Sequence, residues 1–271
     1  MKAILNHKIT DWDAIRLSPD NRAFKYGDGF FETISIVNGV PRLLKNHINR
    51  LRKGAALLKL DVHTMLNLGN IRKSIHALQE TNDILGNAKL RLSIWRNTSG
   101  LYTPADGQAQ MLMTIESLII QKVSIIQNAG FSDIIINYPS PYSSFKTLSA
   151  LKYVLAGIEK KNHHFDDIIL FDYRGYVSET LNSNIFWKKN YTYFTPPLST
   201  GCVAGIMRNW LMDELNMRGF PVEEKLALKD DILEAECIFT TNALGICHVK
   251  YIGERSFIMD PISQEIIEGI S

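Results

Sequence analysis

The chain has 271 residues, of which 45% are hydrophobic and 21% are charged, and its net charge is +2. Such a composition is that of an ordinary globular protein, and the length suits one large domain or two modest ones. Because Lys and Arg are scattered in a near-neutral chain, nothing electrostatic favours binding to nucleic acid or to an acidic membrane surface.

The cysteines and the N-terminal sequence indicate the cellular compartment. Cys202, Cys237 and Cys247 are odd in number, far apart, and have no zinc-like spacing with histidines, so we expect buried thiols in a reducing compartment and no metal site. The N-terminal apolar run is too short for a signal peptide, and no window approaches the ~18 apolar residues of a membrane helix. The expectation is a soluble, cytoplasmic protein.

Residues 1–120 predict a small α/β domain. The stretch FFETISIVNG (30–39) predicts a strand that ends in Asn-Gly, the dipeptide preferred in type I′ hairpin turns. Apolar residues at helical spacing then predict a helix within 43–60. A further helix and two strands are expected at 68–82, 88–97 and 109–118.

Residues 121–271 predict a larger C-terminal domain. Apolar strands around turns are expected at 166–180, 184–197 and 235–253, and a helix with a glycine-rich start within 200–219. Strands outnumber helices without a regular βαβ alternation. The class is therefore α+β or irregular α/β.

One lysine stands out, in SPYSSFKTLSALKYVLAG (140–157). Lys146 lies between Phe145 and Thr147, and an apolar helical pattern starts directly behind it. A free lysine amine has a pKa of about 10.4 and is a poor nucleophile, but apolar surroundings lower that pKa and allow a Schiff base with a carbonyl. Taken alone, a lysine before a helix is far more often an ordinary structural residue than a reactive one.

Two other patterns are weak singly and informative together. In STGCVAGIMRNWL (199–211) two glycines precede a helix whose N-terminus can bind an anion, although the spacing is neither a P-loop nor a dinucleotide fingerprint. Glu179 follows an apolar strand, where it is either an edge charge or an inward carboxylate for a protonated ring nitrogen. A reactive lysine, a phosphate-binding helix start and such a carboxylate are what pyridoxal phosphate requires.

Ordered blocks over nearly the whole chain resemble the class IV, fold-type IV pyridoxal phosphate enzymes, which include branched-chain aminotransferase, D-amino acid aminotransferase and aminodeoxychorismate lyase. The blocks are FKYGDGFFETISIVNGVPRLLKNHINRL, FKTLSALKYVLA, DDIILFDYRGYVSETLNSNIFW, TGCVAGIMR and CIFTTNALGICHV. The resemblance implies a two-domain fold, a pyridoxal 5'-phosphate cofactor, a small amino substrate, and a homodimer with the active site near its interface.

The resemblance also implies roles for single residues. Lys146 matches the catalytic, Schiff-base lysine, Glu179 the carboxylate on the pyridine nitrogen, and Arg50 the arginine that binds the phosphate. Phe31 occupies a substrate position, and Arg96 is the one arginine left near the substrate loop. The rest of the phosphate cradle matches Gly205, Ile206, Met207 and Asn242.

Within the family the chain is most similar to the lyases. The block YGDGFFET and the segment NALGICHV are lyase-like. Leu151 replaces the tyrosine of branched-chain aminotransferases, as in the lyases and the D-amino acid enzymes. The implied reaction converts 4-amino-4-deoxychorismate to 4-aminobenzoate and pyruvate in folate biosynthesis. The loop RNTSGLYTP lacks the second arginine usual in lyases, and Ser149 stands where Asn is common. An aminotransferase for branched-chain L-amino acids or D-amino acids, and a non-catalytic homologue, are the alternatives.

Overall fold

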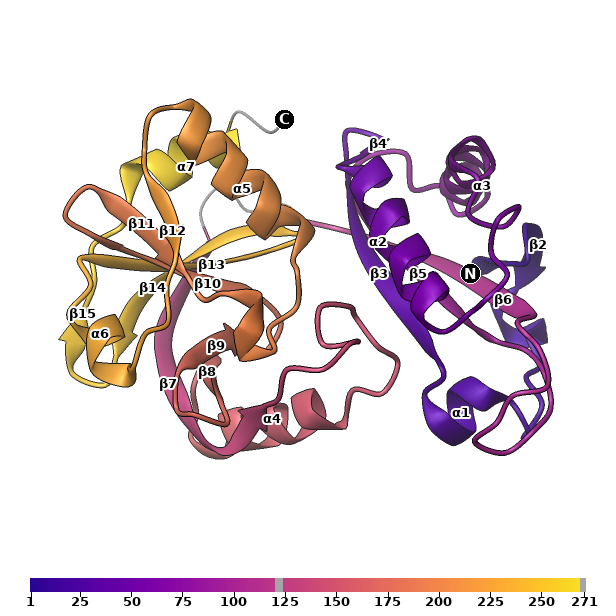
Figure 1. The fold of residues 1–271 in the computed structure, drawn as a ribbon. Helices are drawn as coiled ribbons and strands as arrows, with labels where there is room; N and C mark the ends of the chain where they lie inside the picture. The colour runs from indigo at the N-terminus through magenta and orange to yellow at the C-terminus, as the bar shows by residue number, and fades with distance from the viewer. Residues whose placement is uncertain (120–123, 269–271) are drawn as a thin grey trace. The chain divides into compact units, whose positions relative to one another are not determined.

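The computed structural model describes residues 1–119 and 124–268, and the chain forms two compact units (Figure 1). The N unit comprises Met1–Ile120 and Phe145–Ala150, and the C unit comprises Gln121–Ser144 and Leu151–Ser271. A sequence-based boundary at 120/121 assigned residues 145–150 to the C-terminal domain. In the structure this segment, with Lys146 in it, groups with the N unit instead.

The N unit is built on a six-stranded antiparallel sheet of order β2-β1-β6-β5-β3-β4. Its strands are β1 Lys2–Leu5, β2 Lys8–Asp11, β3 Gly29–Val37, β4 Val40–Pro41, β5 Ala88–Arg96 and β6 Ala109–Ser117. Its helices are α1 Arg22–Tyr26, α2 Leu44–Leu57 and α3 Leu68–Thr81, with a short 3-10 helix at Trp12–Ala14.

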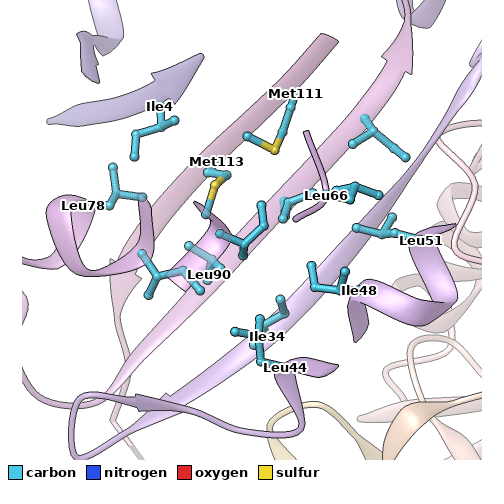
Figure 2. Packing of buried hydrophobic residues seen from close by; sticks show 14 of the residues in the cluster. Ile4, Ile34, Leu44, Ile48, Leu51, Leu66, Leu78, Leu90, Met111 and Met113 are labelled. Atoms are coloured by element: carbon cyan, nitrogen blue, oxygen red, sulfur yellow. The ribbon is translucent and has the colours of Figure 1, made fainter. Parts of the chain in front are cut away.

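Apolar side chains alternate along the strands, and the face on which they lie is covered by α2 and α3. Ile34 of β3, Leu90 of β5 and Met113 of β6 are buried against Ile48 of α2 and Leu78 of α3, as Figure 2 shows. Side chains at even positions of β3 and β5 therefore enter this core, and those at odd positions point to the opposite face. The β3–β4 turn is the expected Asn-Gly turn, with φ of 49° at Asn38 and 81° at Gly39.

The C unit is built on a nine-stranded mixed sheet, in which β12-β11-β10-β13-β14-β7-β8-β9 are in order and β15 pairs with β14. The pairs β7–β8, β7–β14 and β11–β12 are parallel. Its strands are β7 Ser124–Asn137, β8 Asp167–Asp172, β9 Val177–Thr180, β10 Asn184–Lys189, β11 Thr192–Thr195, β12 Val222–Glu224, β13 Cys237–Asn242, β14 Gly245–Ile252 and β15 Arg255–Ser256. Its helices are α4 Leu151–Asn162, α5 Ile206–Met217, α6 Lys229–Leu233 and α7 Pro261–Glu268, with a 3-10 helix at Leu198–Thr200.

The three cysteines are free, and Cys202 and Cys237 are buried while Cys247 is partly buried. Burial raises the pKa of the Cys202 and Cys237 thiols to about 12, with a smaller contribution from the carboxylates of Glu179 and Asp260 respectively. Among the described residues no helix combines the length and apolarity needed to span a bilayer.

The centre of the N-unit core gives a stability test. Leu92 is fully buried on β5, between β3 and β6. We expect Leu92→Ala to lower the free energy of unfolding by about 2–5 kcal/mol, because it removes apolar contacts and leaves a cavity. Urea unfolding followed by circular dichroism measures this. Leu85→Ala, at a side chain that is 63% exposed, is the control and should change it by less than about 0.5 kcal/mol. Equal effects of the two changes would contradict the assigned core.

Candidate active site

Lys146 lies on a short extended segment that pairs with the edge of β3. The backbone N–H of Phe31 donates to the Lys146 carbonyl (2.9 Å), and that of Leu148 donates to the Gly29 carbonyl (3.0 Å). With Phe30 opposite Thr147, this register places Lys146 opposite Phe31, on the same face of the sheet. The half-buried amine lies 5.4 Å from the centroid of the Phe31 ring.

The helix expected directly behind Lys146 begins at Leu151 instead. Residues 147–148 are held extended because they pair with β3, and this long-range pairing overrides the local helical pattern. Lys146 is therefore presented from a sheet edge and not from a helix start.

Arg50 belongs to a buried ionic cluster. Its Nε and one terminal nitrogen each lie 2.6 Å from a carboxylate oxygen of Glu32, and His47 Nδ1 lies 2.6 Å from Glu32 Oε2. Burial raises the pKa of the Glu32 carboxyl, but Arg50 and His47 outweigh it, so the net pKa is below the usual value. Glu32 thus orients the guanidinium that the sequence assigned to the phosphate.

Sequence reasoning missed Glu32 and His47. His47 and Arg50 are three residues apart on α2, so they share a helix face. Glu32 occupies a core-facing position of β3. A carboxylate at an inward strand position was the available signal, because it needs a cationic partner when buried.

Arg96 requires a correction. We expected it to meet the substrate, but its side chain is buried in a structural network of the N unit. Its Nε donates to Asp28 Oδ2 (2.9 Å), and its terminal nitrogens donate to the carbonyls of Asp106 and Leu58. These bonds engage three of the five N–H donors of the guanidinium, and the burial of the side chain argues against contact with a substrate.

In the C unit, Glu179 of β9 is a buried carboxylate with three short contacts. Tyr153 Oη (2.8 Å) and Asn137 Nδ2 (3.0 Å) donate to Oε1, and the backbone N–H of Val203 donates to Oε2 (2.9 Å). Burial, followed by the charge of Glu179, raises the pKa of the Tyr153 hydroxyl well above its ordinary value. Tyr153 consequently stays protonated and remains a donor to Glu179.

The start of α5 is connected to Glu179 through Val203. The Val203 carbonyl accepts from Asn184 Nδ2 (2.8 Å), and Gly205, the N-cap of α5, has no side chain to bond the helix's first N–H groups. Ile206 and Met207 are the first two helical residues, and both are buried. Backbone donors at such a helix start suit a phosphate.

Asn242, at the end of β13, is engaged in the turn that leads to β14. Its Nδ2 donates to Ser183 Oγ (2.9 Å), and its Oδ1 accepts from the Leu244 N–H (2.8 Å). A role for Asn242 in phosphate binding stays a prediction.

Comparison with known proteins assigns the family. Residues 29–252 match the amino-transferase class IV model, and the chain belongs to that family. It is 28% identical to aminodeoxychorismate lyase of Bacillus subtilis over 86% of this chain and 79% of that protein. It is 30% identical to a putative branched-chain-amino-acid aminotransferase of Methanocaldococcus jannaschii over 94% and 89% of the two chains.

Solved structures show the same fold. A branched-chain aminotransferase of Thermoproteus uzoniensis superposes with a TM-score of 0.89 at 23% identity, covering 100% of this chain and 93% of that one. A putative 4-amino-4-deoxychorismate lyase of Legionella pneumophila gives 0.85 at 22% identity, covering 96% and 97%. The chain is a fold-type IV enzyme, and its relatives include both lyases and aminotransferases.

Family membership makes pyridoxal 5'-phosphate the cofactor, and the residues of the C unit fit it. A Cβ at Gly205 would lie 2.0 Å from Asn184 Oδ1, so only glycine allows this close packing at the helix start. The buried carboxylate of Glu179 is held by donors and is suited to a protonated ring nitrogen. In the N unit, Lys146 lies beside Phe31, and Arg50 is oriented by Glu32.

The packing at Gly205 gives a binding test. Gly205→Ala should weaken pyridoxal phosphate binding by about tenfold or more, because the added methyl group would displace Asn184 or the helix start whose N–H groups we expect to bind the phosphate. Gly157→Ala is the control, since its Cβ would meet only Leu181 Cδ1 at 4.0 Å. Titration of each apoprotein with the cofactor, followed by absorbance, gives the affinities. Unchanged affinity in Gly205→Ala would remove the α5 start from the phosphate site.

The ionic cluster predicts a pH dependence. Glu32 has a lowered pKa in the folded protein, so it stabilises the fold above its unfolded pKa of about 4.3 and this contribution is lost as the pH falls through the folded value. Glu32→Gln leaves Arg50 without its carboxylate and should lower the free energy of unfolding by about 3–5 kcal/mol at pH 7. This difference in the free energy of unfolding between wild type and variant should shrink below pH 4. Urea unfolding at pH 7 and below pH 4 measures it, with Glu223→Gln, at an exposed side chain, as the control. A deficit that is the same at both pH values would contradict the assignment.

Proposed function

We propose that the protein is a pyridoxal phosphate-dependent lyase that converts 4-amino-4-deoxychorismate to 4-aminobenzoate and pyruvate. The observation that carries the proposal is Leu151, the first residue of α4, whose apolar side chain is 74% exposed. Branched-chain aminotransferases of the family place a tyrosine here, whereas the lyases and the D-amino acid enzymes do not, and leucine offers no hydroxyl for the cofactor's phenolic oxygen. Leu151 therefore speaks against a branched-chain aminotransferase. The lyase-like blocks around Phe31 and Asn242 and the lyase relative of Bacillus subtilis support the same reaction.

The chain's own residues have distinct tasks in this reaction. When bound, pyridoxal phosphate supplies an electron sink for the substrate's amino-bearing carbon. Lys146 accepts at its Nζ the proton lost from the aminated ring carbon. Glu179, whose carboxylate accepts three hydrogen bonds, would stabilise a protonated ring nitrogen, and Arg50 and the α5 N–H groups would hold the phosphate. The C–O bond to the enolpyruvyl group breaks, the ring becomes aromatic, and the released group becomes pyruvate.

An aminotransferase acting on branched-chain L-amino acids or D-amino acids is the second candidate. The relative of Methanocaldococcus jannaschii, at 30% identity over 94% of the chain, favours it. Such an enzyme would use Lys146 to move a proton between two carbons and would need room for a second amino-acid substrate. A non-catalytic homologue is disfavoured because Lys146, Glu179 and Arg50 are all present. On the lyase proposal the enzyme serves folate biosynthesis in the cytoplasm and acts as a homodimer.

Product analysis separates these reactions. Cofactor-loaded wild type is supplied with 4-amino-4-deoxychorismate, and separately with D-alanine or L-leucine plus 2-oxoglutarate. We expect 4-aminobenzoate and pyruvate from the first mixture. Lys146→Ala should lower that rate by at least about 10³-fold, because the proton acceptor is gone. Lys45→Ala, at an exposed lysine of α2, is the matched control. Glutamate from the second mixtures without 4-aminobenzoate from the first would overturn the lyase in favour of the aminotransferase.

A further inference from the structure

The first turn of α4 carries a lysine that sequence reasoning did not single out. Lys152 directly follows Leu151, the first residue of the helix, and the turn LKYV includes no acidic residue. The N-terminus of a helix carries a partial positive charge, which disfavours a cation at this position. The placement of the Lys152 amine therefore depends on acceptors outside its own helix.

Two side chains of the C unit hold this amine. Lys152 Nζ donates to Asn137 Oδ1 (2.8 Å) and lies 3.7 Å from Glu179 Oε1. The side chain of Asn137 is buried, and its Nδ2 donates to the same Glu179 oxygen (3.0 Å). An amide accepts through its oxygen and donates through its nitrogen, so these two bonds fix the orientation of Asn137. The ammonium of Lys152 thus acts on Glu179 directly and through one buried amide.

Among the described residues of the C unit, Lys152 is the one cation that forms an ion pair with Glu179. Tyr153 and Cys202 also lie near this carboxylate. Burial, followed by the charge of Glu179, raises the pKa of the Tyr153 hydroxyl well above its ordinary value and the pKa of the Cys202 thiol to about 12. Both groups are therefore uncharged near neutral pH, and the positive charge beside Glu179 is that of Lys152.

The two oxygens of Glu179 have different surroundings. Oε1 accepts from Tyr153 and Asn137 and is the oxygen that pairs with Lys152. Oε2 accepts one hydrogen bond within the described chain, from the backbone N–H of Val203 (2.9 Å). A carboxylate oxygen has two lone-pair sites, so Oε2 retains one for an external donor. Oε2 is thus the oxygen available to a protonated ring nitrogen, and Lys152 lies on the side of Oε1.

We propose that Lys152 is a positioning residue that moderates the negative charge that Glu179 presents to the cofactor's ring nitrogen. The inference rests on the role proposed for Glu179. An ammonium beside the carboxylate offsets part of its charge and repels the positive charge of a protonated ring nitrogen. Lys152 therefore lowers the pH at which the ring nitrogen loses its proton, compared with a site that contains Glu179 alone.

Nuclear magnetic resonance of the bound cofactor tests the proposal without a substrate. Each apoprotein is loaded with pyridoxal phosphate labelled with ¹⁵N in the ring, and the ¹⁵N chemical shift, which reports protonation of that nitrogen, is followed against pH. The midpoint should be about one pH unit higher in Lys152→Met than in wild type, because removal of a nearby, partly exposed cation stabilises the protonated form. Lys152→Arg keeps the charge and should behave as wild type. Lys161→Met, at an exposed lysine of the same helix, is the matched control.

Salt and a change at the carboxylate separate an electrostatic role from a structural one. In about 1 M salt the difference between wild type and Lys152→Met should shrink by about half, because ions screen a partly exposed pair. Glu179→Gln should lower the midpoint, and an unchanged midpoint would overturn the role of Glu179 on which the inference rests. Identical profiles of wild type and Lys152→Met, or loss of cofactor binding in Lys152→Met, would overturn the role of Lys152.

Kinetics keep this proposal separate from the proposed reaction. With 4-amino-4-deoxychorismate, the alkaline limb of the kcat profile should move in Lys152→Met by the same interval as the ¹⁵N midpoint, because the electron sink weakens when the ring nitrogen loses its proton. A limb that stays in place would overturn a role for Lys152 in turnover. Absence of lyase activity in the wild type, with a ¹⁵N midpoint that still depends on Lys152, would overturn the proposed reaction and support the positioning role.

Discussion

Two backbone hydrogen bonds between β3 and residues 146–148 determine where the amine of Lys146 lies. Without them Lys146 would be on a loop; with them it is opposite Phe31 in a defined register. An edge strand fixes side-chain direction by its pleat, so the amine, the ring of Phe31 and the guanidinium of Arg91 on β5 share one face. The opposite face of the same strands is closed by α2 and α3, which makes the supporting sheet rigid.

In the C unit a single residue, Val203, connects the candidate site residues. The N–H of Val203 bonds Glu179, its carbonyl bonds Asn184, and two residues later Gly205 begins α5. The buried carboxylate of Glu179 and the N-terminus of α5 are thereby connected by one hydrogen bond and two residues of backbone. Tyr153 and Asn137 complete the environment of Glu179, so the buried carboxylate has hydrogen-bond donors on both of its oxygens.

Local patterns predicted much of this structure. The Asn38-Gly39 turn, the helices at 44–57 and 68–81 and the glycine before α5 follow from turn chemistry and periodicity, and the structure confirms them. Motif order led to Lys146, Glu179 and Arg50. What was missed depends on contacts between distant segments: the start of α4 at Leu151 and the use of Arg96 against Asp28 cannot be deduced from neighbouring residues. The contact of Arg91 on β5 with the Phe31 ring, 3.8 Å from Cζ to the ring centroid, depends on the β3–β5 register, which the sequence leaves open.

The return of residues 145–150 to the N unit has a consequence for the chain's covalent connectivity. The chain passes from the N unit to the C unit after residue 120, returns after 144, and leaves again after 150, so three separate backbone links join the units. A fragment ending at residue 120 would retain the sheet and α2 but would expose the unpaired edge of β3, and it would lack its lysine. Cleavage of the first link alone would release residues 1–120 and leave segment 145–150 covalently attached to the C unit at both of its ends. A single cut there would therefore separate Lys146 from the sheet that positions it, and no single cut yields either unit whole.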